Sequence, residues 1–317
     1  MAINKYIKTA LKTISNMDID IKKDYKLIRR LERAVKRPRI KFTYQIADYQ
    51  IKTDGYNIPI RIFSPADNVI ENLANIKKYP VIIFFHGGGW VTGDLDSYEK
   101  ICLRISRRTG HIVVAAGYRL APENPFPAAL IDCHKTVRTV IRWHKVSGSA
   151  NKITLMGDSA GGNLAAAVSL YMRDRGEKPV DRQILIYPAV YNNHTETSPF
   201  VSVAENGTDY VLTAKHICDY MDLYCSSEKD RSSPYCAPLL SHSFSGQPDT
   251  LILTAQYDPL RDEGEEYGRK LKEAGNKVSV FRIEYTLHGY LSLPATFSAV
   301  KKSYDLINEF LKEGDEG

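Results

Sequence analysis

The feature that most limits the fold of this chain is a series of short apolar runs that alternate with helix-like segments. Six runs have the length and composition of buried strands: residues 81–85, 112–116, 153–156, 182–187, 251–255 and 278–283. Helices are expected between or after them, near residues 98–108, 128–145, 162–175, 263–274 and 296–312. Continuous apolar strands separated by helices are typical of a mostly parallel sheet that helices cover on both faces. The sequence therefore predicts an α/β fold.

An antiparallel hairpin is predicted ahead of these strands. Residues 44–52 and 58–64 are strand-like and flank a turn at residues 53–57 that contains a glycine. The hairpin brings the predicted sheet to eight strands. No core strand is expected between residues 187 and 251, and the polar, aromatic stretch at 191–233 is interpreted as an insertion above the sheet.

The first 41 residues are basic and carry apolar side chains at helical spacing. They hold thirteen Lys or Arg against four Asp or Glu, a surplus of nine, so the rest of the chain contributes −3 to the net charge of +6. The apolar residues are Ile7, Ala10, Leu11 and Ile14, followed by Leu27, Ile28, Leu31 and Val35. This spacing predicts amphipathic helices that dock their apolar faces on the protein and turn their charges to solvent. No nucleic-acid partner is expected, since no binding motif accompanies the charge.

Composition indicates an ordinary globular protein. No apolar stretch is long enough to span a bilayer and the N-terminus lacks an apolar signal region, so we expect a cytoplasmic protein without stable membrane insertion. The cysteines are Cys102, Cys133, Cys218, Cys225 and Cys236. Five is an odd number and no Cys-x-x-Cys pair occurs, which argues against a disulfide framework and against a zinc site. We expect isolated, reduced thiols, and neither a metal nor a cofactor.

A Gly-x-Ser-x-Gly pattern directly follows the apolar run at 153–156. It comprises Gly157, Asp158, Ser159, Ala160 and Gly161. A serine on a tight turn between a buried strand and a helix has its hydroxyl exposed above the sheet, and small neighbours allow the strained turn. Ser159 is therefore the candidate nucleophile, and it needs a base, an orienting acid and an oxyanion site elsewhere in the chain.

Consecutive glycines follow the run at 81–85, where ligands of α/β folds are bound. The segment reads His86, Gly87, Gly88, Gly89 and Trp90. Without side chains in the way, the amides of Gly88 and Gly89 can point at a substrate oxygen, together with the amide of Ala160. A phosphate loop would require Lys followed by Ser or Thr after the last glycine, which is not found here. His86 is expected to form a hydrogen bond within this loop.

The base and the acid are expected in loops that follow later strands. Of the eight histidines, His288 lies just after the last predicted strand, and Asp258 follows the run at 251–255. Asp262 is a rival acid, but it lies at the start of a predicted helix, where an acidic residue acts as a cap or against the helix dipole. The resulting order is Ser159, Asp258, His288, as in α/β-hydrolases.

These motifs together resemble the hormone-sensitive-lipase-like family of α/β-hydrolases, whose bacterial members are carboxylesterases and acetyl esterases. The resemblance rests on residues 86–90, 118–123, 157–163, 258–264 and 288–290, in the family's order. Two departures are visible. Asn124 stands where the family often has His, and Trp90 and Tyr290 stand where Phe is common. Neither departure affects a proposed triad residue.

The resemblance implies a small helical cap over the sheet, formed by residues 1–41 and by the insertion at 191–233. The catalytic domain would then span residues 42–317. Residues that could line an acyl pocket or pack within the cap are Tyr191, Phe200, Tyr210, Val211 and Leu212. Glu123 is implied to be a buried carboxylate near the site, although a turn residue is nearly as consistent with its position. Family members are often homodimers.

The function implied is that of a serine carboxylesterase that acts on small-molecule esters with short to medium acyl chains. Ser159 would form an acyl-enzyme, His288 would act as base, and Asp258 would orient it. An amide hydrolase of the arylformamidase type has a similar glycine segment and serine turn, and the sequence does not separate the two. A noncatalytic ligand-binding homologue, such as the gibberellin receptor, is less consistent with the chain because His288 is retained.

Overall fold

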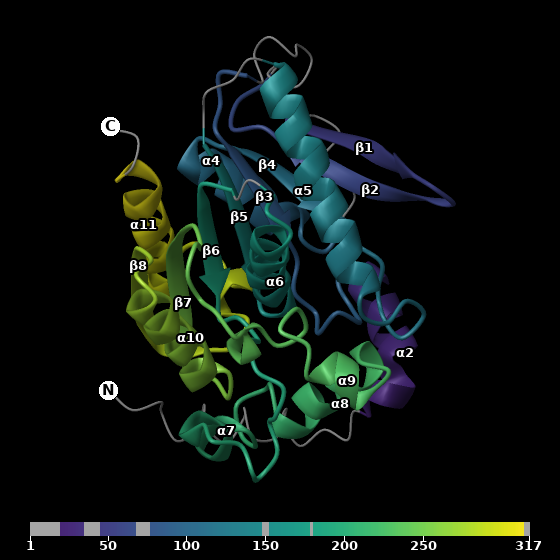
Figure 1. The fold of residues 1–317 in the computed structure, drawn as a ribbon, viewed down its shortest axis with the longest axis vertical. Coiled ribbons are helices and arrows are strands. Elements are labelled where there is room, and N and C mark those ends of the chain that lie inside the picture. The colour runs from purple at the N-terminus through teal and green to yellow at the C-terminus, as the bar shows by residue number, and fades with distance from the viewer. Residues whose placement is uncertain (1–19, 35–44, 68–76, 148–151, 178–179, 314–317) are drawn as a thin grey trace.

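The computed structural model describes residues 20–34, 45–67, 77–147, 152–177 and 180–313. Eight strands form one sheet in the order β1-β2-β4-β3-β5-β6-β7-β8 (Figure 1). Their bounds are β1 Ile46–Thr53, β2 Tyr56–Phe63, β3 Val81–Phe85, β4 Ile112–Ala116, β5 Ile153–Asp158, β6 Arg182–Ile186, β7 Asp249–Tyr257 and β8 Val278–Leu287. Strands β3 to β8 are parallel, and the hairpin β1-β2 is antiparallel. The predicted α/β fold with an eight-stranded, mostly parallel sheet is confirmed.

The hairpin has a tighter turn than predicted. Thr53 is paired with Tyr56, so only Asp54 and Gly55 connect the strands. Gly55 has φ of 82°, a left-handed conformation that glycine adopts without a steric cost. An Asp-Gly pair in a two-residue turn matches the right-handed twist of the strands that it joins, which explains the short connection.

Helices cover both faces of the sheet, and side chains alternate between the two faces along each strand. The helices are α4 Glu99–Thr109, α5 Ala128–Val146, α6 Ala160–Asp174, α10 Arg261–Glu273 and α11 Ser298–Lys312. Ile83 and Leu155 pack in the core with α5, α6 and α10, whereas Phe84 and Met156 pack in the core with α4 and α11. Strands β3, β4, β5 and β6 are therefore buried on both sides, as predicted. The same prediction was wrong for β8, because this strand lies at the edge of the sheet and leaves Val280 and Phe281 37% and 40% exposed.

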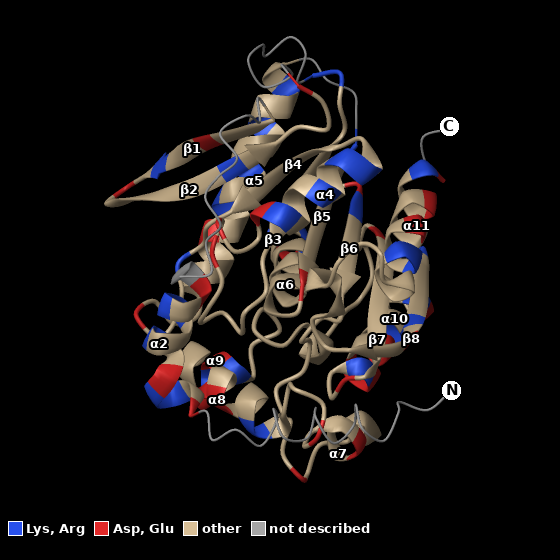
Figure 2. Ribbon diagram, turned by 180° about the vertical axis from the view of Figure 1, so that it is seen from behind, with Lys and Arg blue, Asp and Glu red and all other residues tan. Residues whose placement is uncertain are grey.

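The remaining helices lie together near the carboxyl ends of the parallel strands (Figure 1). They are α2 Ile21–Ala34, α7 Val201–Asn206, α8 Ala214–Tyr224 and α9 Glu228–Arg231. The last three lie within the predicted insertion, and no strand interrupts the described residues between β6 and β7. Lys22 of α2 forms an ion pair with Asp222 of α8, and Figure 2 shows the charged segments of these helices close together.

The orientation of α2 differs from the prediction. Leu27 and Leu31 are 54% and 57% exposed, although the apolar spacing predicted that they would dock on the protein. Arg29 instead turns inward and has a side chain only 17% exposed. The prediction was wrong for Leu27 and Leu31, because Arg29 finds hydrogen-bond acceptors on the body of the protein, whereas Ile28 is partly buried. Ile7, Ala10, Leu11, Ile14 and Val35 lie outside the described residues.

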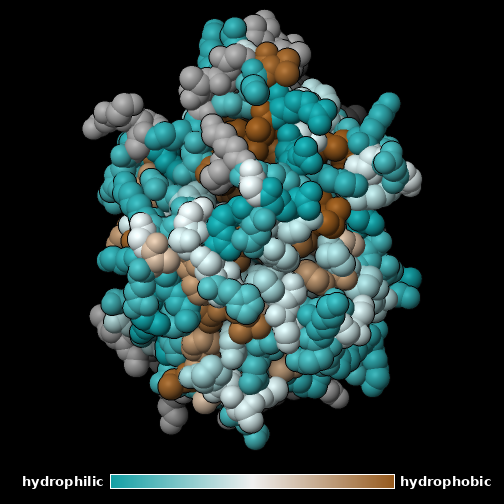
Figure 3. Space-filling model, viewed as in Figure 1, coloured by the Kyte–Doolittle hydropathy of each residue, from teal (hydrophilic) through white to brown (hydrophobic). Residues whose placement is uncertain are grey.

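No described helix has both the length and the apolar composition to cross a membrane. The face shown in Figure 3 is mostly hydrophilic and carries separate apolar spots.

All five cysteines are free, as expected, but two are not isolated: the Sγ atoms of Cys225 and Cys236 lie 3.1 Å apart. The two residues are 11 positions apart in the chain, with α9 between them.

Candidate active site

Ser159 lies on a strained turn between β5 and α6. Its φ of 55° and ψ of −121° are unusual for a residue with a side chain. A Cβ atom on Gly161 would lie 2.0 Å from the carbonyl oxygen of Phe85, and one on Gly157 would lie 2.2 Å from the carbonyl oxygen of Gly161. Both flanking positions therefore require glycine. The packing of the turn against β3 holds the serine in a conformation that an isolated chain would avoid.

His288 lies between Ser159 and Asp258 and forms a hydrogen bond with each. The distance from His288 Nε2 to Ser159 Oγ is 2.8 Å, and that from His288 Nδ1 to Asp258 Oδ2 is 2.7 Å. Asp258 is fully buried, and the side chain of His288 is 13% exposed. The imidazole also packs edge-on against Tyr187, with ring centroids 4.8 Å apart. The structure thus brings together the three side chains that the sequence singled out.

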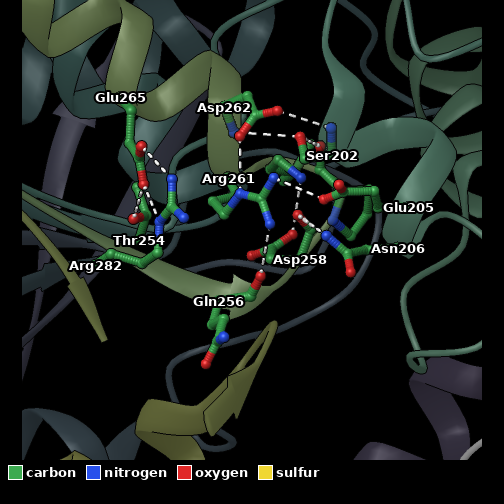
Figure 4. A network of polar contacts seen from close by, with 12 residues as sticks. Ser202, Glu205, Asn206, Thr254, Gln256, Asp258, Arg261, Asp262, Glu265 and Arg282 are labelled. Carbon is green, nitrogen blue, oxygen red and sulfur yellow. Dashed lines mark hydrogen bonds and ion pairs between the residues drawn. The ribbon is translucent and has the colours of Figure 1, made fainter. Parts of the chain in front are cut away.

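The loop that carries Asp258 is bound to helix α7 (Figure 4). The backbone amide of Ser202 donates to Asp262 Oδ2 at 2.7 Å, and Ser202 Oγ donates to the carbonyl oxygen of Pro259 at 2.8 Å. Asn206 Nδ2 donates to the carbonyl oxygen of Asp258 at 3.3 Å. Asp262 therefore joins the loop to α7 and makes no contact with His288, in agreement with the local structural role inferred from the sequence.

Arg261 and Gln256 extend the same network toward β8 (Figure 4). Arg261 forms an ion pair with Glu205 of α7 at 2.9 Å and donates to the carbonyl oxygen of Gln256 at 3.1 Å. The Gln256 side chain accepts from the backbone amide of Tyr285 at 2.7 Å, three residues before the histidine. The strand that precedes the acid is thereby linked to the strand that precedes the base. No pattern in the sequence indicated these contacts.

The buried side chains of Glu263 and His194 also hold the start of the insertion. Glu263 accepts from the backbone amides of Val190 at 2.7 Å and Tyr191 at 3.1 Å, and its other oxygen lies 2.6 Å from His194 Nε2. Both side chains are at most 1% exposed. His194 lies beside none of the catalytic motifs in the sequence. The only available signal was the position of Glu263 in the 258–264 motif.

The glycines after β3 adopt conformations that suit an oxyanion site. Gly88 and Gly89 have φ of 113° and 59°, and a Cβ atom on either would lie 2.4 Å from its nearest neighbour. The Gly88 carbonyl accepts from the amides of Val91 and Thr92, which closes the turn. Among the described residues, no acceptor pairs with the amides of Gly88 and Gly89. Ala160 begins α6, so its amide precedes the first hydrogen bond within the helix.

Asp158 is buried behind the glycine turn. Its oxygens accept from the Tyr98 hydroxyl at 2.9 Å and from the Gly87 amide at 3.0 Å. Burial raises the pKa of this carboxyl to about 6, even though both hydrogen bonds favour the ionised form. Asp158 thus links the serine turn to the start of the glycine turn.

His86 is held within the same loop, as the sequence predicted. Its ring stacks on Tyr118 with centroids 4.3 Å apart, and its Nδ1 donates to the carbonyl oxygen of Gly87 at 2.8 Å. Burial lowers the pKa of His86 to about 4, so the ring is neutral at physiological pH. A neutral, stacked imidazole holds the loop and cannot replace His288 as a base, because it does not contact the serine.

The expectation that Glu123 is buried is wrong. Its side chain is 46% exposed and forms a two-pronged ion pair with Arg29, in which both distances are 3.0 Å. Burial opposes ionisation, but the Arg29 guanidinium outweighs it and lowers the pKa of Glu123. The carboxylate lies at the surface because its partner comes from α2, a helix whose inward face the sequence did not predict.

The aromatic residues of the predicted insertion pack mainly against one another and against the body of the protein. Tyr191 and Phe200 meet edge-on at 5.1 Å, and Tyr210 stacks on Tyr257 at 5.2 Å. Leu212 is partly buried, whereas Val211 is 40% exposed. These contacts favour the packing interpretation over a pocket formed by all five residues.

The two unusual aromatic residues of the motifs are buried. Trp90 stacks on Tyr224 of α8, with centroids 4.5 Å apart. Tyr290 packs against Tyr187 and forms a hydrogen bond with the Ser303 hydroxyl at 2.7 Å.

Within the part of the chain that the structure describes, no three His, Cys, Asp or Glu side chains are grouped as a metal site requires.

Comparisons with known proteins identify a matching family and several similar esterases. The sequence profile of the α/β hydrolase fold matches residues 82–292. An arylesterase from Saccharolobus solfataricus is 34% identical over 255 residues, which cover 78% of this chain and 78% of the relative. An ethyl acetate hydrolase from Pseudomonas putida is 30% identical over 273 residues, 84% of this chain and 82% of the relative. The solved structure of a hyperthermophilic esterase from Pyrobaculum calidifontis superposes with a TM-score of 0.84 at 32% identity and covers 98% of both chains.

Proposed function

Because this chain belongs to the α/β-hydrolase family and is a carboxylic ester hydrolase, we propose that it is a serine carboxylesterase with Ser159 as its nucleophile. The observation that carries the proposal is the continuous hydrogen-bonded line from Ser159 Oγ through His288 to the buried Asp258. A serine hydroxyl becomes nucleophilic when an adjacent base can take its proton, and this line supplies the base and the group that orients it.

The reaction proceeds in two similar steps. His288 Nε2 removes the proton from Ser159 Oγ as the oxygen attacks the ester carbonyl, and Asp258 holds the imidazole and stabilises its cation. The amides of Gly88, Gly89 and Ala160 donate to the carbonyl oxygen as it becomes negative. His288 then gives its proton to the leaving alcohol, and an acyl group remains on Ser159. Water, activated by the same base, attacks this acyl-enzyme and restores the serine.

The substrates that we propose are small esters with short to medium acyl chains. One relative is named for the hydrolysis of ethyl acetate, and aromatic and apolar cap residues pack near the carboxyl ends of the strands. Residues 1–41 and 191–233 would form the cap, and residues 42–317 the catalytic domain that carries the insertion. We further propose a cytoplasmic location, because five free cysteines, two with adjacent sulfur atoms, suit a reducing compartment. A homodimer is proposed by the family resemblance alone.

The proposal is tested with p-nitrophenyl acetate and butyrate. We expect Ser159→Ala to abolish turnover, with a circular dichroism spectrum and melting temperature close to those of the wild type. A chain-length series beside an aryl formamide separates esterase from amide hydrolase activity in the same assay. Undiminished turnover by Ser159→Ala would remove the serine mechanism. A preference for the formamide, or for long-chain triglycerides over butyrate, would overturn the proposed substrate class.

A further inference from the structure

Arg29 of α2 contacts the segment that follows the oxyanion glycines. Its Nε donates to the carbonyl oxygen of Val91 at 2.7 Å, and its Nη2 donates to the carbonyl oxygen of Ala121 at 2.6 Å. The guanidinium also holds Glu123 with two hydrogen bonds and lies over the ring of Tyr25, 4.9 Å from its centroid. Four hydrogen bonds are more than a surface arginine needs to anchor a helix, and two of them reach backbone carbonyls.

These bonds complete the set of restraints on the glycine turn. The carbonyl of Gly88 accepts from Val91 and Thr92, and the carbonyl of Trp90 accepts from the amide of Ala121 at 3.0 Å. Arg29 binds the next carbonyl, that of Val91. Because a peptide plane is rigid, fixing the carbonyls of this tight turn limits the directions in which its amides can point.

A second residue of α2 acts on the far end of the same turn. Glu32 accepts from the backbone amide of Gly93 at 3.1 Å. Helix α8 also contacts the turn, because the ring of Tyr220 lies so close to Gly89 that a Cβ atom would be 2.4 Å from it. Both α2 and α8 therefore contact the turn. Glycines at positive φ are free to change conformation, and these contacts restrict that freedom.

We propose that Arg29 is a positioning residue for the oxyanion site, which orients the amides of Gly88 and Gly89 by holding the carbonyls of Val91 and Ala121. The proposal rests on the proposed esterase function and adds to it a role for a helix that contributes no group to the triad. Oxyanion donors act only when they are aimed in advance at the position of the developing charge. Loss of Arg29 would leave the donors present but less well aimed.

The experiment compares Arg29→Ala with two other variants of α2, Lys22→Ala and Arg30→Ala. Lys22 anchors α2 to Asp222 of α8 without touching the glycine turn, and Arg30 is exposed on the same helix. We expect Arg29→Ala to lower kcat for p-nitrophenyl butyrate by about tenfold or more with little change in KM, because a misplaced donor loses transition-state binding in particular. Lys22→Ala and Arg30→Ala should keep kcat within about twofold of the wild type on the same reasoning.

A transition-state analogue gives a readout that simple helix anchoring would not change. An alkyl trifluoromethyl ketone accepts Ser159 Oγ at its carbonyl carbon, its oxygen becomes an oxyanion, and the proton passes to His288. We expect its inhibition constant to rise in Arg29→Ala by the same factor by which kcat/KM falls. Arg29→Lys should restore only part of the activity, since an ammonium cannot reproduce the fork of donors. It also serves as the test if Arg29→Ala does not fold.

Two outcomes would overturn the proposal. Wild-type kcat together with a lowered melting temperature would show that Arg29 only anchors α2. An unchanged inhibition constant despite a lower kcat would place the defect outside the oxyanion site. Neither result would affect the esterase assignment, which depends on the separate loss of turnover in Ser159→Ala.

Discussion

The sheet and the helices α2 and α7 are stabilised by different interactions. Ile83 and Phe84 of β3 are fully buried among apolar side chains on opposite faces of the sheet. By contrast, α2 contacts the catalytic loops through Arg29 and Glu32, and α7 contacts them through hydrogen bonds of Ser202. The proposed active site lies between these regions, so that the proposed triad stands on strands held by apolar packing while its loops depend on polar contacts.

Because the two regions are held by different interactions, they should respond differently to salt and to substitutions. Apolar burial is non-directional and insensitive to salt, whereas an exposed ion pair is weakened by screening and a hydrogen bond is lost when its geometry shifts. The sheet should therefore determine the stability of the whole chain. The polar contacts of α2 and α7 should determine the alignment of the site, and their loss should cost less stability.

The largest expected effect is the loss of stability when a buried side chain of the sheet is truncated. Ile83→Ala leaves a cavity in the sheet and should reduce the free energy of unfolding by about 2–5 kcal/mol. Lys22→Ala removes an exposed ion pair of α2 and should reduce it by about 0–1 kcal/mol. Urea unfolding at low and high salt measures both, and only the effect of Lys22→Ala should shrink as salt rises. If Ile83→Ala does not fold, Ile83→Val should still cost about 0.5–1.5 kcal/mol.

Equal losses from the two changes would contradict the comparison. In that case the ion pair between α2 and α8 would be as important to stability as the buried apolar core. The Arg30→Ala variant controls for any general effect of removing a positive charge from this helix, since Arg30 is exposed.

A second prediction concerns Asp158, a polar exception in the apolar sheet. Burial raises its pKa to about 6 from an ordinary value of 3.8, so the native protein holds this proton between these pH values after the unfolded chain has released it. The contribution of Asp158 to stability should therefore fall as pH rises from about 4 to 6 and stay constant above, with a slope of at most about 1.4 kcal/mol per pH unit.

Asp158→Asn tests this sign. The amide keeps the shape of the side chain and removes the titration, so the difference in unfolding free energy, wild type minus variant, should fall between pH 4 and 6. His86 titrates in both proteins and cancels in this difference, although its lowered pKa of about 4 makes each protein less stable as pH falls below 6.5. A difference that rises with pH would mean that the carboxylate is favoured by its bonds to Tyr98 and Gly87 over its burial.

The difference between apolar packing in the sheet and polar contacts of the helices also explains which features could be predicted from the sequence. Strands β3 and β4 match the apolar runs at 81–85 and 112–116, because a fully buried strand requires apolar residues throughout. Ser159, Asp258 and His288 could be located because each directly follows a strand of the sheet, although β8, which precedes His288, is largely exposed. The inward turn of Arg29 could not, since a charged residue on a helix faces solvent unless acceptors are present. Those acceptors, Val91 and Ala121, are 62 and 92 residues away in the chain.

The smallest predicted effect tests the outward face of α2. Leu31 is 57% exposed, so Leu31→Ala should change the free energy of unfolding by less than about 0.5 kcal/mol. Ile21 at the start of the helix is 4% exposed, and even the mild change Ile21→Val should cost about 0.5–1.5 kcal/mol. Urea unfolding of both variants at one pH provides the measurement. A larger loss from Leu31→Ala than from Ile21→Val would mean that the apolar face of α2 docks as its spacing predicted, and that the inward position of Arg29 is not the stable arrangement of this helix.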